Sequence, residues 1–249
     1  MSRAAAVLAQ VALALLALGG CRRHYPPVES FELSEGGGCA TLEDTTPYCW
    51  GTDSVPPSDK PVVASGPSRA APAPARFTLA GRELCDRNAT PPACEQLPAE
   101  PVSFAESPHH ACVVLPEGSV RCRGEQDHGR LGAGAGDAKV TRAVPGIEGA
   151  KTVAVGDDFS CALLRNLTVS CWGDNAKHAL AQPDTGVHTE PVPVVGMFAV
   201  KKLGARGDQA CASLTDGGLR CWGSVRGPAG ASMGRPGTAN NVPMPVQFP

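Results

Sequence analysis

The residues with the clearest chemical potential in this chain are cysteines that recur in pairs at one fixed spacing. Four segments each place nine residues between two cysteines, and three of the four end in Cys-Trp-Gly. The pairs are Cys39 and Cys49, Cys112 and Cys122, Cys161 and Cys171, and Cys211 and Cys221. The last three copies begin 49 and 50 residues apart, which is a period long enough for one small sheet per repeat. The sequence therefore predicts a repeat protein.

Paired cysteines can bind a metal or form disulfides. Structural zinc sites generally take cysteines two to four residues apart, and the sequence contains no such pair. We therefore predict a disulfide within each of the four pairs and a fifth between Cys85 and Cys94, with no metal site. Such a framework is typical of an oxidising compartment.

Each cysteine pair also fits an antiparallel hairpin. If the two cysteines face each other directly, they are close enough for a disulfide, and the turns of the second and fourth copies are centred at Glu117 and Asp216. A three-residue loop needs positive φ in its last position, and a glycine follows each of these two residues. The first and third copies have Thr45 and Leu167 where this turn favours glycine, so the sequence does not determine the hairpin register of these two copies.

The amino terminus has the proportions of a lipoprotein signal. A short basic start precedes an apolar run of about fifteen residues, too short for a membrane span, and Leu-Gly-Gly-Cys21 resembles the bacterial lipobox. Cys21 is also the one cysteine without a hairpin partner. We predict a signal peptide over residues 1–20, a lipid on Cys21 and a tether over residues 21–27. The alternative is an ordinary signal peptide with a coincidental cysteine.

The predicted location is the bacterial cell envelope. Arg22 follows the lipid cysteine, whereas an aspartate there would resemble an inner-membrane retention signal. We therefore expect a lipid-anchored protein of the outer membrane that faces the periplasm or the exterior. No segment after the signal is long and apolar enough to read as a membrane span.

Composition bounds the fold and the partners. The balance of 22 basic and 24 acidic residues produces no field that attracts nucleic acid, so no nucleic-acid partner is expected. Aromatic residues are scarce and glycine and proline are abundant, which is typical of many short strands and turns. No helical periodicity with proper caps follows residue 21. We predict one all-β domain over residues 28–249.

Two segments depart from the repeat. Residues 52–76 contain six prolines and are interpreted as an irregular segment, either a mobile loop or the degraded outer half of the first repeat. Residues 82–97 are interpreted as an insertion that Cys85 and Cys94 close into a compact loop. At the carboxyl terminus, a repeat begins at Val242 and never continues. We expect this last strand to complete the first repeat, as in a circular propeller.

The repeat resembles a known family. The pattern consists of Pro-Val before a glycine, an Ala-x-Gly strand, Cys-Ala-Leu, a turn and Val-x-Cys-Trp-Gly. It is similar to the regulator of chromosome condensation repeat, in the cysteine-bearing form of secreted bacterial proteins. Residues 154–173 match this pattern best. The resemblance implies a β-propeller of four-stranded antiparallel blades, usually seven in number, whereas about four are counted here. Closure into a ring, an open arc and assembly with a second copy all remain possible.

The tryptophans Trp50, Trp172 and Trp222 each follow the second cysteine of a pair. Buried, they would pack between blades. Exposed on one rim, they would form an aromatic surface for a protein or a glycan. Their fixed place after a hairpin cysteine favours repeat packing.

Catalytic constellations are sparse. His109 and His110 precede Cys112, and the pair Asp157-Asp158 occupies the matching place in the next repeat. A shared turn-capping or packing role explains this recurrence more simply than acid–base chemistry. The sequence contains no Gly-x-Ser-x-Gly, phosphate-loop or His-Glu-x-x-His motif. We therefore predict no catalytic residues and no cofactor.

The resemblance implies only that the protein acts by binding another protein. A nuclear relative exchanges guanine nucleotide on a small GTPase and a secreted bacterial relative inhibits β-lactamases, but neither activity transfers residue by residue. We expect a non-enzymatic lipoprotein that binds an envelope or extracellular protein through propeller rim loops, with a glycan as the other kind of partner. The alternatives are a regulator of an envelope enzyme, acting through an aromatic anchor on the Cys85–Cys94 loop, and a glycan hydrolase with convergent carboxylates.

Overall fold

The computed structural model describes residues 26–34, 37–51, 58–63, 75–132, 139–224 and 240–246. The predicted signal peptide, Cys21 and most of the tether lie outside the described residues, as does most of the irregular segment 52–76. None of the helical structure in the described part is long and apolar enough to cross a membrane.

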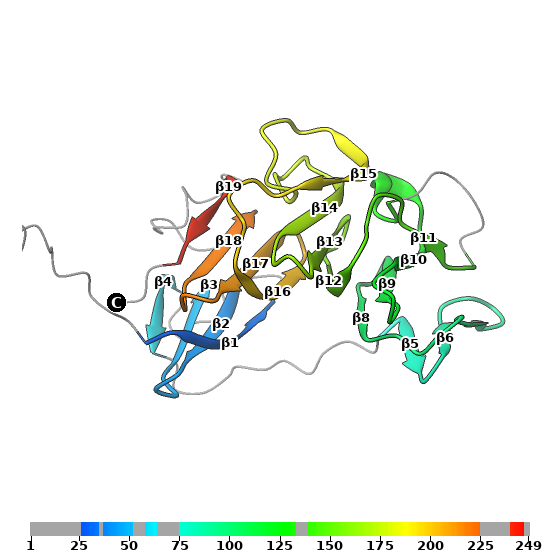
Figure 1. Cartoon of the computed structure of the whole chain (residues 1–249), viewed down its shortest axis with the longest axis horizontal. Coiled ribbons are helices and arrows are strands. Elements are labelled where there is room, and N and C mark those ends of the chain that lie inside the picture. Colours follow the sequence, from blue (N-terminus) through cyan, green and yellow to red (C-terminus); the bar gives the residue numbers. More distant parts are fainter. Residues whose placement is uncertain are drawn as a thin grey trace, which may run out of the picture.

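The described residues form five antiparallel sheets, named A to E in chain order (Figure 1). Sheet A contains β1 (Val28–Leu33), β2 (Gly37–Leu42), β3 (Pro47–Gly51) and β4 (Ser58–Val63). Sheet B contains β5 (Phe77–Ala80), β6 (Glu83–Asp86) and β7 (Ala93–Gln96). Sheet C contains β8 (Ser103–Glu106), β9 (His110–Val114), β10 (Val120–Gly124) and β11 (Arg142–Ala143), with the short 3-10 helix η1 (Asp127–Gly129) before its last strand. Sheet D contains β12 (Ala150–Val155), β13 (Phe159–Leu164), β14 (Val169–Asp174) and β15 (Val187–Pro193). Sheet E contains β16 (Val200–Arg206), β17 (Gln209–Leu214), β18 (Leu219–Gly223) and β19 (Asn240–Pro245).

The cysteines face each other directly across the two middle strands of each four-stranded sheet. All five disulfides are formed, with Cα atoms 4.0 to 4.1 Å apart. Thr45 and Leu167 adopt φ of 67° and 65°, so these two turns take the same geometry as the glycine-containing turns. The hairpin register expected for the second and fourth copies therefore holds in all four.

Sheet B includes the segment interpreted as an insertion. Residues 82–97 supply β6 and β7, which pair with β5 into a small sheet closed by Cys85–Cys94. Phe77, Leu84 and Leu97 on one face of this sheet are buried against sheet C. The segment is thus part of the array of sheets.

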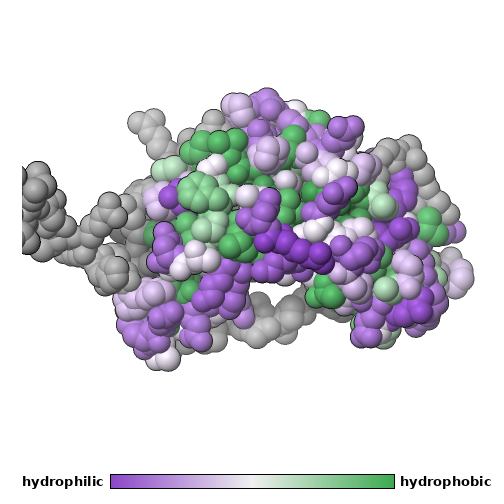
Figure 2. All heavy atoms as spheres, in the orientation of Figure 1, coloured by the Kyte–Doolittle hydropathy of each residue, from purple (hydrophilic) through white to green (hydrophobic). Residues whose placement is uncertain are grey.

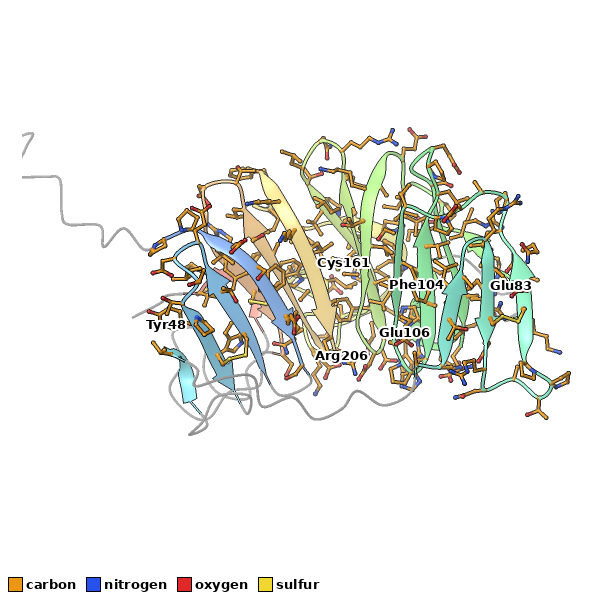
Figure 3. The ribbon with its side chains drawn as sticks, turned by 90° about the horizontal axis from the view of Figure 1, so that it is seen from below. Tyr48, Glu83, Phe104, Glu106, Cys161 and Arg206 are labelled. Carbon is orange, nitrogen blue, oxygen red and sulfur yellow. A yellow bond between two sulfur atoms is a disulfide. The ribbon has the colours of Figure 1, made fainter. Side chains whose placement is uncertain are left out.

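The five sheets pack face to face in the spatial order B, C, D, E, A (Figures 1 and 3). A separate hydrophobic core fills each of the four junctions. Each core combines the disulfide-bearing face of one four-stranded sheet with the alanine- and tryptophan-bearing face of the next, except at the junction of B and C. Sheets A and B lie at opposite ends, so the described sheets form an open arc.

The expectation that the last strand completes the first repeat is wrong. β19 pairs with β18 and completes sheet E. The Val-Pro segment that suggested a new repeat is the end of an outermost strand, as in β15 of sheet D. The residue that follows each outer strand then enters the next core. Val194 lies between sheets D and E, and Val246 lies between sheets E and A.

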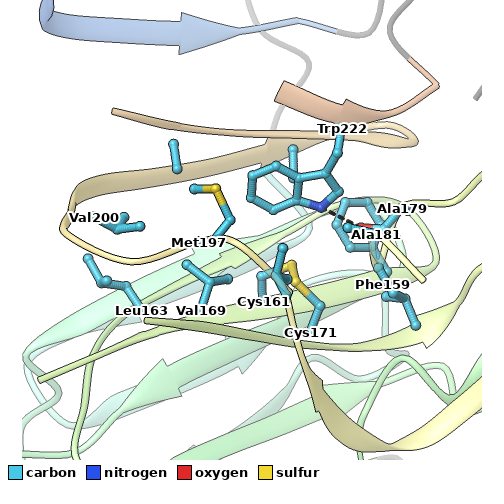
Figure 4. Packing of buried hydrophobic residues seen from close by; sticks show 14 of the residues in the cluster. Phe159, Cys161, Leu163, Val169, Cys171, Ala179, Ala181, Met197, Val200 and Trp222 are labelled. Carbon is cyan, nitrogen blue, oxygen red and sulfur yellow. Dashed lines mark hydrogen bonds between the residues drawn. A yellow bond between two sulfur atoms is a disulfide. The ribbon is translucent and has the colours of Figure 1, made fainter. Parts of the chain in front are cut away.

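The three tryptophans are fully buried at these junctions. The indole Nε1 of Trp172 donates to the carbonyl of Arg130 at 3.0 Å, and that of Trp222 donates to the carbonyl of Ala179 at 2.9 Å (Figure 4). Trp50 occupies the same place in sheet A and packs against sheet E. Burial of such large side chains contributes strongly to each junction.

Sheet C carries Arg123 where the other repeats carry tryptophan. Arg123 is fully buried and faces sheet B. Its guanidinium donates to the carbonyls of Leu84 at 3.0 Å and Ala93 at 3.2 Å. At this junction the arginine therefore adds hydrogen bonds to the backbone of sheet B in the place where the other sheets carry a tryptophan.

Candidate binding groove

The first strands of the four-stranded sheets lie side by side along the concave edge of the arc. β12 lies between β8 and β16, and β16 also contacts β1. Figure 3 looks onto this edge, where Phe104, Glu106 and Arg206 mark the inner strands β8 and β16. Residues from all four strands line one cavity of about 350 Å³. We call this cavity the inner groove.

The groove has an apolar lining. Phe31 and Leu33 come from β1, Val153 from β12 and Leu203 from β16. Phe31, Leu33 and Leu203 are only partly buried, so part of their surface faces the groove. Gly204 permits this arrangement, because a Cβ there would lie 2.9 Å from the Phe31 ring. Apolar surface left in a cavity is a source of binding energy.

Lysines form the edge of the groove. Lys201 and Lys202 line it and are exposed, and Lys151 is exposed at the matching place on β12. A β-bulge at the same position of β12 and β16 makes Lys151 and Lys201 equivalent. Lys202 Nζ donates to the carbonyl of Glu29 at 2.8 Å. Within the described part of the chain, these three ammonium groups form no ion pair. Figure 2, in the orientation of Figure 1, shows hydrophilic residues near β12 and β16.

Two hydroxyl groups complete the lining. Ser103 Oγ accepts a hydrogen bond from the amide of Val153 at 3.2 Å. Thr152 Oγ1 is buried and has no hydrogen-bond partner among the described residues. Lys201 and Lys202 are the charged residues among those described that line the groove, and no carboxylate lines it. The arrangement suits the binding of an anionic group and provides no acid–base pair.

The histidine singled out by the sequence lies in a sealed network between sheets C and D. His110 is fully buried, with Nδ1 3.1 Å from Ser107 Oγ and Nε2 2.7 Å from Ser160 Oγ. Ser160 Oγ donates to the carbonyl of Arg130 at 3.1 Å, so it accepts from His110. Burial, followed by the nearby Arg130 charge, lowers the pKa of His110 to about 3. The histidine–serine pair is therefore a neutral structural contact.

A chain of ion pairs joins sheets B, C and D. Arg76 bonds Asp86 at 3.0 Å and Glu125 at 2.6 Å, and Arg130 bonds Glu125 at 3.2 Å and Asp158 at 2.5 Å. Burial opposes ionisation of Asp86, but the hydrogen bond from Arg76 and further favourable contacts outweigh it and hold the pKa of this carboxyl below its ordinary value. Burial likewise opposes ionisation of Glu125, and the hydrogen bonds from Arg76 and His109 outweigh it and lower its pKa.

These pairs also account for the neighbouring polar features. A second cavity of about 220 Å³ is lined by Arg76, Asp86 and Glu125, which are joined by ion pairs. His128, Asp158 and Asp174 bring possible metal ligands within 4.8 Å of one another. Because the Arg130 guanidinium already neutralises Asp158, we assign no metal to this cluster.

Comparison with known proteins addresses the repeat and the fold. Residues 150–178, which contain β12, β13 and β14, match the model of the regulator of chromosome condensation (RCC1) repeat. No curated protein sequence matches the chain. Prp20p from Saccharomyces cerevisiae, a structure described with its binding to Gsp1p and histones, superposes with a TM-score of 0.50 at 17% identity. Human WBSCR16 superposes with a TM-score of 0.51 at 15% identity.

The chain has an RCC1-like β-propeller fold. The Prp20p match covers 88% of this chain and 51% of that protein, and the WBSCR16 match covers 90% and 54%. The chain therefore spans about half the length of these RCC1-like structures. At such identities the likeness concerns the fold alone, so function must be argued from the groove.

The inner groove was not predicted from the sequence, which pointed to rim loops. The groove combines residues from the inner strands of four separate repeats, and the sequence of each strand alone is that of an ordinary inner strand. The lysine that recurs at positions 151 and 201 could have indicated the groove, because charged residues at the same place of two adjacent repeats lie on the same face of the array.

Proposed function

We propose that this chain is a non-enzymatic binding module of the bacterial envelope, lipid-anchored through Cys21, that binds a protein partner along the inner groove. The observation that carries the proposal is the groove itself. Its lining combines apolar side chains with lysines at the edge, and its described residues include no carboxylate.

One rim loop extends this surface. Between β15 and β16, Val195 is 75% exposed and Phe198 is 69% exposed. The preceding repeat carries Pro145 and Glu148 at these positions. Phe198 lies three residues before Lys201, in the loop that leads into β16. Exposed aromatic residues of this kind are common anchors in protein interfaces.

The cellular setting is argued from the cysteines. The five disulfides are expected outside the cytosol, where an oxidising environment maintains them. The lipobox-like sequence ending at Cys21 supports a lipid anchor, and the residue after it supports the outer membrane. The mature chain would then present its groove to the periplasm or the exterior.

The two alternatives receive less support from the geometry. An inhibitor acting through the Cys85–Cys94 segment would need an exposed aromatic anchor, but residues 87–92 contain none and Phe77 is buried against sheet C. A glycan hydrolase would need a pair of carboxylates facing its substrate. The groove lining supplies lysines instead.

Two measurements test the proposal. Cys21→Ala should move the protein from the membrane to the soluble fraction, and unchanged fractionation would remove the lipid anchor from the proposal. A photo-crosslinking amino acid placed at Leu203 in cells should yield one reproducible protein adduct, whereas the same residue at the remote exposed Lys177 should not. Adducts that do not depend on position would contradict binding at the groove.

A further inference from the structure

The inner groove has a chemical polarity that specifies a class of partner, given that the chain is a binding module as proposed above. Lys201 and Lys202 are the charged residues among its described lining, and Lys151 lies beside Thr152, which also lines it. None of these ammonium groups is neutralised by a carboxylate in the described part of the chain. Three unneutralised cations along one edge attract a partner with several negative charges.

The size of the groove limits what can enter it. A volume of about 350 Å³ is at the small end of ligand pockets, so it admits one or two side chains with their backbone and excludes a folded surface. Phe31 and Leu33 from β1 and Leu203 from β16 offer these side chains an apolar contact. The partner therefore needs an apolar residue as well as negative charge.

The inner strands also favour an extended partner. β16 is the edge strand of sheet E, and Lys201 to Gly204 of this strand face the groove. An edge strand offers backbone donors and acceptors to a chain laid alongside it.

We propose that the inner groove binds an acidic, extended peptide segment of a partner protein. Its carboxylates contact Lys151, Lys201 and Lys202, and an apolar side chain enters between Phe31 and Leu203. The neighbouring Phe198 contacts the residues of the partner that leave the groove at the rim. Acidity and an apolar anchor at short spacing are thus the recognition signal.

Fluorescence anisotropy tests this proposal with the full chain in detergent micelles. The probe is a fluorescein-labelled peptide, Asp-Glu-Leu-Asp-Phe-Glu-Asp. The double variant Lys201→Glu/Lys202→Glu should weaken binding by at least about tenfold, because two attractions become repulsions. Lys177→Glu is the control, since it reverses one charge on an exposed loop of sheet D, and it should leave affinity within about twofold.

Three results would overturn the proposal. The peptide could fail to bind, it could bind equally well when serine replaces its leucine and phenylalanine, or Lys177→Glu could weaken it as much as the groove variant. Acetylation footprinting separates a peptide from a lipid ligand. Lys201 and Lys202 should be protected by the peptide, and protection by phosphatidylglycerol in mixed micelles without peptide would assign the lysines to lipid.

Failure of this proposal and failure of the proposed function give different experimental results. A position-dependent adduct in cells together with a failed peptide titration would leave a binding module whose partner has other chemistry. Absence of any adduct together with tight peptide binding would contradict the cellular role alone.

Discussion

The amide of Val28 donates a hydrogen bond to the carbonyl oxygen of Gly217 at 2.9 Å. Val28 begins the first sheet, whereas Gly217 lies in the hairpin turn of the last. The same bond joins the covalently consecutive sheets, from Ala150 to Gly118 at 2.9 Å and from Val200 to Leu167 at 3.0 Å. Sheet A therefore occupies the place of a repeat that follows sheet E, although their junction is non-covalent.

Gly217→Ala should weaken this junction. Gly217 has φ of +85°, and a Cβ there would lie 2.5 Å from Pro27 Cβ and 2.6 Å from its Cα. We expect a loss of about 2–4 kcal/mol in the free energy of unfolding, from backbone strain and overpacking together. Urea unfolding followed by tryptophan fluorescence measures it. Gly218→Ala is the control, since the nearest atom to its Cβ would be the flexible end of Asp216 at 3.1 Å, with Leu214 at an ordinary contact distance of 3.8 Å. Equal losses in the two variants would contradict the prediction.

The disulfides should differ in their contribution to stability. Cys161 and Cys171 are fully buried at a junction, whereas Cys94 is exposed on the free face of sheet B. The two closed loops have nearly equal lengths, so each contributes about 3 kcal/mol through the unfolded chain. The double alanine variant at 161 and 171 should therefore lose more stability than that at 85 and 94, because it also removes buried sulfur atoms. Thermal unfolding compares them, and equal losses would argue against the junction role.

Arg123→Ala should loosen sheet B selectively. The substitution removes charged donors from the carbonyls of Leu84 and Ala93, each worth about 1.5–3 kcal/mol. Amide hydrogen exchange should accelerate in residues 77–96 and stay unchanged in sheets D and E. Arg220→Ala, at the position of sheet E that matches Arg121, removes a hydrogen bond to the carbonyl of Pro243 and should spare sheet B. Uniform acceleration throughout the chain would contradict this role of Arg123.

Stability should fall with acid in a range set by His110. Its pKa is about 3 in the folded chain and near 6.5 when unfolded, so between these values the unfolded state binds one more proton. The contribution of neutral His110 to the free energy of unfolding is therefore complete above pH 6.5 and is lost as the pH falls toward 3. Between pH 6.5 and 5.5 the carboxyls of Asp86 and Glu125, whose pKa values are lowered by folding, stay largely ionised in both the folded and the unfolded state. The unfolding free energy should drop there by up to about 1.4 kcal/mol per pH unit.

His110→Gln should flatten this slope. Glutamine fits the position, because the equivalent residue of sheet E is the buried Gln209. His109, which bonds Glu125, is present in both proteins and cancels in the comparison. Urea unfolding at several pH values measures the slopes, and an unchanged slope in the variant would exclude His110 as its source.

The repeat and its register could be predicted because they depend on local chemistry. Opposed cysteines at a spacing of ten positions allow few hairpins, and the structure extends the same register to the turns at Thr45 and Leu167. Sheet B could not be predicted, because its strands have four residues each, too few for a periodic pattern. Its one available signal was Arg123, whose break in the Cys-Trp-Gly pattern marks a repeat that faces a different kind of sheet.

The spatial order of the sheets depends on long-range packing. Sheet A lies against sheet E because Val28, Leu42 and Trp50 match the disulfide face of sheet E, and complementarity of this kind leaves no local pattern. The inner groove depends on that order, since it combines β1 with β16. Its residues could therefore be identified only in the folded chain.

The two sheets that form the junction of E and A are synthesised at different times. Gln209 donates to the carbonyl of Ser34, which precedes it by 175 residues. At a synthesis rate of about 5–20 residues per second, the residues of sheet A are made on the order of ten to thirty seconds before those of sheet E that cover Trp50. The apolar face of sheet A, which is synthesised early, can thus be buried only after sheet E has been made.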